Sequence, residues 1–322
     1  MASHAKSIGI LGAGAFGTAL ALVFSKNFNV TLFSCFDEHV EMMVNNRINE
    51  FLSDVTLPDN INIKATKHLE KSVFDYLFWV FPVAPSIDIL DDIKDKLDGT
   101  TVVIGSKGLS VSSQFLLSVF ETNLPNSRIA YLAGPNFAAD LAFDKMAAAD
   151  VATRSLTHAT SLASELSTET FKLYPTDDII GIQICGAMKN VIAIACGISD
   201  GLNLGASMHA AILSFAIAEM KGLGIKLGAR ETTFYGLCGI GDLVLTSSSA
   251  LSRNMSFGMR IAQGEKIDYV LSKNKAVCEG YDSVSHIVQL AKQNQVELSI
   301  CNTVHDILFC NSDPKSIINV FK

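Results

Sequence analysis

A glycine motif directly after the first apolar run constrains the fold of this chain more than any other feature. Ser7–Leu11 is a short β-prone run, Gly12-Ala-Gly14-Ala-Phe-Gly17 follows it, and residues 18–25 have a helical pattern. Strand, glycine turn and helix in this order are typical of a Rossmann-like dinucleotide-binding unit. There the first glycine permits the tight turn, the second lets backbone N–H groups approach a pyrophosphate, and the third lets the helix pack on the strand. The alternative is a turn whose glycines serve only the backbone.

Short apolar runs alternate with helical segments through the rest of the first half. The expected strands are residues 7–11, 29–33, 62–64, 76–81, 101–105, 128–132, 147–152 and 170–174. This alternation is typical of a doubly wound parallel sheet. Because ligands bind such sheets at the carboxyl ends of the strands, the residues that follow the strands are candidate site residues.

Three positions after the expected strands carry candidate side chains. Asp37 either contacts the adenosine ribose of a dinucleotide or caps the next helix, and the lack of a basic residue beside it favours NAD over NADP slightly. Lys107, which lies between Gly105 and Gly108, suits an anion or a carbonyl oxygen, unless it is a solvated loop lysine. Asn136 is expected to cap the next helix and to line the same ligand site.

A long apolar stretch, residues 178–199, follows Pro175 and is expected to form a buried central helix, because apolar residues run nearly all the way round it. Thr176 or Asp177 is the expected cap. Lys189 lies in the middle of this stretch. Burial lowers the pKa of a lysine towards the range of a general acid or base. Alternatively, Lys189 reaches the surface or pairs with a structural carboxylate.

After this helix the pattern is wholly helical, with no strand alternation. Gly239-Ile-Gly241-Asp242 is interpreted as a helix end that presents Asp242. Ser252-Arg253-Asn254 offers the fork and the donors that phosphate oxygens accept, or else an ordinary capping loop. Glu279 is either a helix-end charge or a contact near a cofactor. We therefore predict an α/β chain with an N-terminal Rossmann-like doubly wound parallel sheet, residues 1–177, followed by an all-α C-terminal substrate and catalytic domain, residues 178–322.

Composition narrows the classes of function. The 322 residues are 49% hydrophobic and 18% charged, and the net charge of −7 gives no general reason to bind nucleic acid or an anionic membrane. Seven cysteines form no C-x-x-C pair, which fits a reducing cytosol, and the few histidines show no metal-ligand spacing, so no metal is expected. Without an apolar leader or an uncharged run of about 18 residues, the chain is expected to be soluble and cytoplasmic, with no integral membrane contact.

The order of motifs resembles the NAD(P)-dependent glycerol-3-phosphate dehydrogenase family of the bacterial biosynthetic type. The motifs that carry the resemblance are Gly12-x-Gly14-x-x-Gly17-Thr18, Ser106-Lys107-Gly108-Leu109, Gly134-Pro-x-Phe137-Ala138, Gly186-x-x-Lys189-Asn190-Val191, Gly239-x-Gly241-Asp242-Leu243, Ser252-Arg253-Asn254 and Glu279-Gly280-Tyr281. The resemblance implies interconversion of dihydroxyacetone phosphate and sn-glycerol 3-phosphate with NAD(H) or NADP(H), for glycerophospholipid biosynthesis, by a homodimer.

The resemblance also implies residue roles, with Lys189 as the catalytic acid and base. The implied substrate contacts are Lys107, Gly134, Asn136, Lys189, Asn190, Asp242, Ser252, Arg253 and Asn254. The implied cofactor contacts are Gly12, Gly14, Ala15, Phe16, Gly17, Cys35, Lys107, Ala138, Arg253, Val277 and Glu279.

The chain departs from the family pattern at Cys35, Val83 and Phe215, where relatives often carry a basic residue or His, a Ser or Thr, and an Arg. Cys35 leaves the choice between NADH and NADPH open. Two other functions are compatible with the sequence: a related two-domain 3-hydroxy acid dehydrogenase that binds a carboxylate in place of the phosphate, and a non-catalytic module that senses NAD(H).

Overall fold

The computed structural model describes residues 6–71, 74–110, 113–249, 251–273 and 278–321. Within it the chain forms two compact units. The first contains residues 1–106, 116–132 and 136–177, and the second contains residues 107–115, 133–135 and 178–322. Two short segments from the first half of the chain therefore belong to the second unit.

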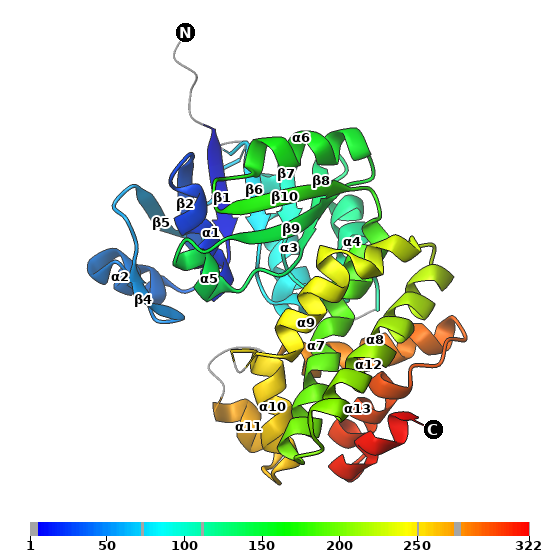
Figure 1. Ribbon diagram of the computed structural model, residues 1–322. Coiled ribbons are helices and arrows are strands. Elements are labelled where there is room, and N and C mark those ends of the chain that lie inside the picture. Colours follow the sequence, from blue (N-terminus) through cyan, green and yellow to red (C-terminus); the bar gives the residue numbers. More distant parts are fainter. Residues whose placement is uncertain (1–5, 72–73, 111–112, 250, 274–277, 322) are drawn as a thin grey trace. The chain divides into compact units, whose positions relative to one another are not determined.

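An eight-stranded sheet is the centre of the first unit (Figure 1). Its strands, in chain order, are β1 (Ser7–Leu11), β2 (Asn29–Ser34), β5 (Ile61–Ala65), β6 (Tyr76–Trp79), β7 (Thr101–Ile104), β8 (Arg128–Ala133), β9 (Ala147–Ala152) and β10 (Phe171–Thr176). In space the order is β10-β9-β8-β7-β6-β1-β2-β5, and pairs such as β1–β2 and β6–β7 run parallel. The strand order reverses beside β1, so the fold is doubly wound, as predicted.

Helices cover both faces of this sheet. They are α1 (Ala15–Phe24), α2 (Asp37–Asn46), α3 (Val83–Leu97), α4 (Leu116–Asn123), α5 (Ala138–Ala142) and α6 (Leu156–Leu166). Neighbouring residues of β6 show the two layers: the Phe78 ring lies 4.9 Å from that of Phe24 on α1, and the Trp79 ring lies 4.9 Å from that of Phe120 on α4. Because successive residues of a strand point to opposite faces, burial of both Phe78 and Trp79 means that both faces are covered.

A small hairpin in the first unit was not predicted. It consists of β3 (Ile48–Asn49) and β4 (Leu52–Thr56), which pair antiparallel. The first helix, predicted over residues 18–25, spans Ala15–Phe24 in the structure, so it begins three residues earlier than expected and ends one residue earlier.

The second unit is helical, as predicted, and α7 (Ile179–Gly201) runs through its centre (Figure 1). Around it lie α8 (Ala206–Lys226), η2 (Glu231–Tyr235), η3 (Leu237–Gly241), α9 (Asp242–Ser247), α10 (Arg253–Ala262), α11 (Ile267–Lys273), α12 (Glu279–Gln293), α13 (Ser299–Phe309) and η4 (Pro314–Phe321). The predicted cap of α7 was wrong by one residue. Asp178 caps the helix, because its Oδ1 accepts the Gly181 N–H at 2.9 Å while Oδ2 accepts the Arg230 N–H at 2.9 Å.

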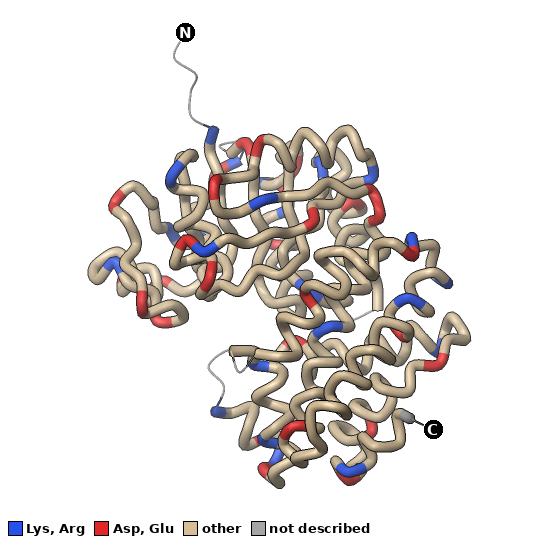
Figure 2. The backbone as a smooth tube through the Cα atoms, in the orientation of Figure 1, with Lys and Arg blue, Asp and Glu red and all other residues tan. Residues whose placement is uncertain are grey.

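Two of these helices, α7 and α8, are long and apolar enough to cross a membrane by length and composition alone. The most apolar window of α7 is 89% buried inside the unit, which is how the core helix of a soluble protein passes the same test. The corresponding window of α8 is only 28% buried. In Figure 2, acidic and basic residues are interspersed over the outer segments of both units.

Candidate active site

The glycine turn between β1 and α1 has the geometry that a dinucleotide-binding turn requires. Gly12 has a φ of +119°, and a Cβ there would lie 2.9 Å from the backbone carbon of Val80. A Cβ on Gly17 would lie 1.9 Å from the carbonyl oxygen of Gly12. No larger residue fits at either position, so these two glycines are required by the turn and by the helix that packs on it.

Gly14 differs from its two neighbours in the motif. It is the N-cap residue of α1, and a Cβ built on it would meet no atom within 4 Å. Packing within the chain therefore does not demand a glycine at this position. The space beside it borders the first turn of α1, which begins with Ala15 and Phe16 and contains no acidic residue. A helix N-terminus with open backbone donors favours an anion, so the turn fits a pyrophosphate.

A buried polar network supports this turn, and sequence reasoning missed it. Asn49 on β3 donates from Nδ2 to the Ala13 carbonyl oxygen at 2.9 Å and to Thr18 Oγ1 at 2.6 Å. Its Oδ1 lies 3.2 Å from His39 Nε2, and His39 Nδ1 lies 3.1 Å from Ser34 Oγ. Asn49 lies far along the chain from the glycine motif, and no local pattern in the sequence connects the two.

The residues after β2 lie where a Rossmann-like fold places the adenosine ribose of a bound dinucleotide. Cys35 is exposed there, with its Sγ 3.7 Å from Thr66 Oγ1. Asp37 begins α2 without capping it, since Phe36 is the N-cap residue, and its carboxylate pairs with Lys67 Nζ at 2.5 Å. The capping interpretation of Asp37 is therefore wrong, whereas the ribose interpretation stays a prediction.

Asn136 and Ala138 lie in the first unit, after β8. Asn136 is buried, and Ala138 is the first residue of α5. The N-cap residue of α5 is Phe137, so the expectation that Asn136 caps this helix is wrong.

Gly134 belongs to the short segment, residues 133–135, that is part of the second unit, and its φ is +159°. In this segment Pro135 Cγ lies 3.5 Å from the position that a Cβ on Gly241 would take. Val277 lies outside the described residues.

Two lysines share one carboxylate in the second unit. Lys189 Nζ on α7 donates to Asp242 Oδ1 at 2.6 Å, and Lys107 Nζ lies 3.4 Å from Asp242 Oδ2. Thr246 Oγ1, one turn further along α9, accepts from Lys189 Nζ at 3.0 Å and lies 3.3 Å from Asp242 Oδ1. The structure thus brings together three predicted site residues, Lys107, Lys189 and Asp242, and adds Thr246, which the sequence analysis did not single out.

Burial is the main influence on the pKa of Lys189 in this cluster. Lys189 is 5% exposed and Asp242 is 1% exposed. Desolvation lowers the pKa of Lys189 from 10.5 to about 8; the Asp242 carboxylate opposes this fall and the Lys107 ammonium adds to it. Two ammonium groups against one carboxylate leave a net positive charge in a low-dielectric site. Such a site stabilises negative charge that develops on an oxygen atom.

A second network continues along the same helix from Asn190. Its Nδ2 donates to Glu279 Oε2 at 2.9 Å, and its Oδ1 accepts from Asn254 Nδ2 at 3.0 Å. Asn254 Oδ1 in turn accepts the Gly280 N–H at 2.9 Å and the Cys278 thiol, with Sγ at 3.2 Å. Three elements, α7, α10 and α12, are held together by these amide groups. The predicted residues Asn190, Asn254 and Glu279 therefore form one connected set.

The N-terminus of α10 carries the remaining predicted residues. Ser252 caps the helix, because its Oγ accepts the Met255 N–H at 3.3 Å, so the capping interpretation of this serine is correct. Arg253 is the first residue of the helix and is exposed, and among the described residues its guanidinium has no hydrogen-bond or ion-pair partner. A guanidinium beside a helix N-terminus is well suited to a phosphate.

One further cavity, of about 250 Å³, lies elsewhere in the first unit. It is lined by the first residues of β6, β7 and β8, which are Tyr76, Thr101 and Arg128, together with His158 and Glu165 of α6. This is the amino-terminal edge of the sheet, whereas the glycine turn follows the carboxyl end of β1. The cavity is therefore separate from the glycine turn.

Comparisons with known proteins agree with this arrangement. Family models described as the N-terminus and the C-terminus of NAD-dependent glycerol-3-phosphate dehydrogenase match residues 7–159 and 178–319. Glycerol-3-phosphate dehydrogenase (NAD(P)+) of Maricaulis maris is 40% identical over 311 residues, covering 95% of this chain and 93% of the relative. The enzyme of the same name from Francisella tularensis subsp. novicida is 36% identical over 318 residues, with 97% and 96% covered.

A solved structure supports the same conclusion. The crystal structure of glycerol-3-phosphate dehydrogenase from Coxiella burnetii superposes with a TM-score of 0.94 at 31% identity and covers 98% of each chain. With both halves of the family matched in order and near-complete coverage of the relatives, this chain belongs to the NAD-dependent glycerol-3-phosphate dehydrogenase family.

Proposed function

We propose that this protein catalyses the reversible reduction of dihydroxyacetone phosphate to sn-glycerol 3-phosphate with NADH or NADPH, for glycerophospholipid biosynthesis. The observation that supports this most strongly is Lys189, a lysine buried on a central helix and held 2.6 Å from Asp242. A structural lysine has no need of a lowered pKa, whereas a proton donor that works near neutral pH does.

Lys189 carries the proton in this proposal. In the direction of reduction its ammonium donates a proton to the oxygen on C2 of the substrate, and in the direction of oxidation the neutral amine removes that proton. Lys107 adds a second positive charge that stabilises the developing alkoxide. Asp242 orients both ammonium groups, and the Thr246 hydroxyl, which accepts a hydrogen bond from Lys189 Nζ, further restricts the position of that ammonium.

The phosphate of the substrate is assigned to the N-terminus of α10. Arg253 supplies a planar guanidinium, and Ser252 and Asn254 flank it with a hydroxyl and an amide. Asn190, which is bonded to Asn254, and the backbone at Gly134 and Asn136 complete the proposed substrate contacts. A phosphate fixed at one end of a three-carbon substrate sets where its C2 lies, and this alignment lowers the entropic cost of the reaction.

The nicotinamide nucleotide supplies the hydride when bound. We assign its pyrophosphate to the open backbone at Gly14, with Gly12, Ala15, Phe16 and Gly17 around it. Cys35, Lys107, Ala138, Arg253, Val277 and Glu279 remain the proposed contacts of the rest of the nucleotide. Arg47, the nearest arginine in sequence after β2, donates instead to the carbonyl oxygens of Leu57 and Ile61, which supports NADH as the preferred cofactor.

The function is tested by following absorbance at 340 nm with dihydroxyacetone phosphate and each reduced nucleotide in turn. We expect the reduced nucleotide to be consumed with dihydroxyacetone phosphate. We expect no consumption with 3-oxo acids, the unphosphorylated oxidised counterparts of 3-hydroxy acids. Turnover of the unphosphorylated compounds alone would identify the related 3-hydroxy acid dehydrogenase, and nucleotide binding without turnover of any substrate would identify a sensing module.

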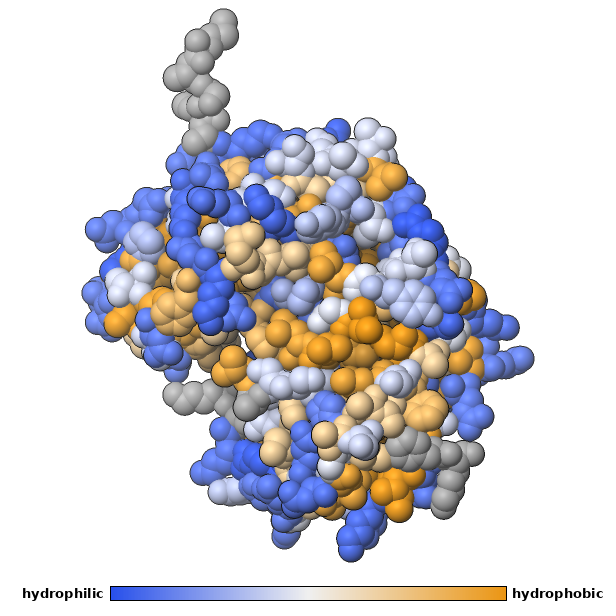
Figure 3. Space-filling view, in the orientation of Figure 1, coloured by the Kyte–Doolittle hydropathy of each residue, from blue (hydrophilic) through white to orange (hydrophobic). Residues whose placement is uncertain are grey.

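We further propose a homodimer in the cytoplasm, with the functions divided between residues 1–177 and 178–322. Support for the dimer comes from α8 and from η2, η3 and α9, which follow it, because large apolar side chains are exposed there: Phe215, Ile225, Tyr235, Ile240 and Val244. Figure 3 shows apolar side chains gathered on the surface over this region of the second unit. All seven cysteines are free thiols, which supports a reducing compartment. Light scattering on the wild-type chain and on Ile225→Asp tests the dimer; equal masses at the monomer value would contradict it.

A further inference from the structure

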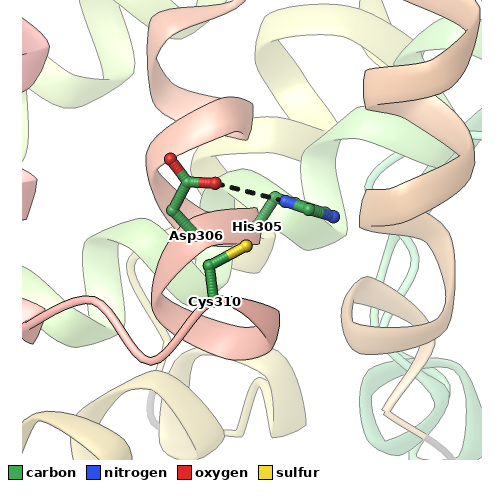
Figure 4. A group of neighbouring side chains, drawn as sticks. All are labelled: His305, Asp306 and Cys310. Atoms are coloured by element: carbon green, nitrogen blue, oxygen red, sulfur yellow. Dashed lines mark hydrogen bonds and ion pairs between the residues drawn. The ribbon is translucent and has the colours of Figure 1, made fainter.

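The C-terminal end of α13 and its C-cap residue bring together three side chains of metal-ligating type that the proposed reaction does not use. A ring nitrogen of His305, a carboxylate oxygen of Asp306 and the sulfur of Cys310 all lie within 4.8 Å of one another (Figure 4). The sequence analysis expected no metal because the histidines have no ligand spacing. That expectation rested on a linear pattern, whereas this group is made by the way the helix ends.

The end of α13 explains how residues five apart become neighbours. The Cys310 N–H and the Ser312 N–H both donate to the Asp306 carbonyl oxygen, at 3.0 and 3.1 Å. Asn311 has a φ of +56°, the left-handed conformation that closes many helices. The chain therefore folds back over its own last turn, and the Cys310 side chain lies beside the imidazole of His305 (Figure 4).

The imidazole is already held in place before any metal binds. Its ring lies 5.4 Å from the Phe309 ring, with an interplanar angle of 32°, and the His305 side chain is only 27% exposed. Nδ1 of His305 lies 3.4 Å from Asp306 Oδ1. The carboxylate and the thiol are exposed, so both can rotate towards a common centre.

Electrostatics independently favours a cation at this position. The carbonyl groups at the end of a helix carry partial negative charge, and Asp306 adds a full negative charge in the last turn. The last turn of α13 contains no lysine or arginine to balance it. A bound cation would remove this unfavourable interaction.

We propose that His305, Asp306 and Cys310 form a zinc site with one coordination position left for water. A sulfur, a nitrogen and an oxygen donor form a ligand set suited to Zn²⁺, which accepts all three in tetrahedral geometry. Bonds of about 2.0–2.3 Å place tetrahedral ligand atoms about 3.3–3.8 Å apart. The three ligand atoms already lie within 4.8 Å of one another, so small rotations of the exposed side chains bring them to a common centre. The Cys310 thiol loses its proton to solvent as the sulfur–zinc bond forms. The metal would stabilise the conformation of the turn that joins α13 to η4.

Cobalt titration of the full chain, stripped of metal with a chelator, tests the proposal. We expect one Co²⁺ per chain with a near-ultraviolet sulfur-to-cobalt charge-transfer band, which Zn²⁺ abolishes by displacement. Cys310→Ser should lose the band and weaken zinc binding at least tenfold, and His305→Ala should weaken zinc binding to a similar degree. Cys35→Ser is the matched control for metal binding alone, because Cys35 is also an exposed thiol, and it should keep the cobalt band and the zinc affinity of the wild-type chain.

Two further readouts separate this site from the proposed activity. Zinc should raise the Tm of the wild-type chain and of Cys35→Ser but not that of Cys310→Ser. Turnover of dihydroxyacetone phosphate should be equal with and without the chelator, because none of the three residues is part of the active site. Absence of the charge-transfer band in the wild-type chain, or an equal band in Cys310→Ser, would overturn the zinc site whether or not the enzyme is active.

Discussion

Replacing Asp242 with asparagine isolates the effect of one buried negative charge on Lys189. Asparagine has nearly the same shape and still accepts a hydrogen bond, so the change removes the charge and keeps the packing. The carboxylate lies 2.6 Å from Lys189 Nζ and also faces Lys107 at 3.4 Å. In Asp242→Asn, two ammonium groups therefore face each other in a buried site with no counter-charge.

The size of the effect follows from the pKa of Lys189. In the wild-type chain burial lowers this pKa to about 8, with Asp242 opposing the fall. An opposite charge at this range raises the pKa of a lysine by about 1–3 pH units, so its loss lowers the pKa by about that amount. If the fall is about 2 units, the protonated fraction at pH 7 drops from about nine-tenths to about one-tenth. Protonation alone then reduces the rate of reduction about tenfold at pH 7.

The assay is the pH profile of kcat in both directions, with saturating nucleotide. For reduction, which needs the ammonium form, the rate of the wild-type enzyme should fall above about pH 8, and that of Asp242→Asn should fall at a pH lower by about 1–3 units. Lowering the pH should therefore restore part of the lost reduction rate. For oxidation, which needs the neutral amine, the rising limb should move down by the same amount.

Asp91→Asn serves as the control, because Asp91 is an exposed carboxylate on α3 that pairs with Lys94, three residues further along the same helix. It should reproduce the wild-type profile. If the basic limb of Asp242→Asn coincides with that of the wild-type enzyme, Asp242 does not tune the proton donor and the reasoning is refuted.

Three other substitutions test separate parts of the structure. Lys189→Ala should lose several orders of magnitude in kcat while the nucleotide Kd, measured by fluorescence, stays close to the wild-type value; near-normal turnover would contradict the acid and base role. Arg253→Ala should lower kcat/KM for dihydroxyacetone phosphate mainly by raising KM, and an unchanged ratio would contradict the phosphate assignment. Glu219→Gln should flatten the pH dependence of Tm: desolvation raises the pKa of Glu219 from 4.5 to about 7, so its contribution to stability is fully present below pH 4.5 and is lost as the pH rises through 7. This shift corresponds to about 3 kcal/mol, and wild-type and variant Tm values that fall in parallel from pH 5 to 8 would disprove the assignment.

The sequence predicted the fold class because the strands of the first unit and the helices of the second have clear periodic patterns. It did not predict the β3–β4 hairpin, whose residues are mostly exposed and polar and lack an alternating apolar pattern. It placed the cap of α7 one residue early, because Asp178 is chosen by contacts with the Arg230 N–H and with Thr233, which are distant in sequence.

The sequence predicted those site residues that stand out from a local pattern and missed those that only tertiary contacts bring together. Lys189 was recognisable because a single lysine interrupts a helix that is apolar on all sides. Its partner Thr246 and the Asn49 support of the glycine turn depend on tertiary contacts, and no spacing in the sequence marks them. The proposed zinc ligands were missed because His305, Asp306 and Cys310 meet at the end of a helix at a spacing that no familiar metal-ligand pattern contains.

The division of the chain also limits how such an enzyme can arise or be re-engineered. Residues 107–115 and 133–135 leave the nucleotide-binding half to pack with the helical half, and they bring Lys107 with them. A gene cut at residue 177 would therefore give a C-terminal fragment that lacks one of its two ammonium groups. The two halves are therefore not interchangeable modules. If the nucleotide-binding half is exchanged between relatives, residues 107–115 and 133–135 must still pack against the helices of the second unit.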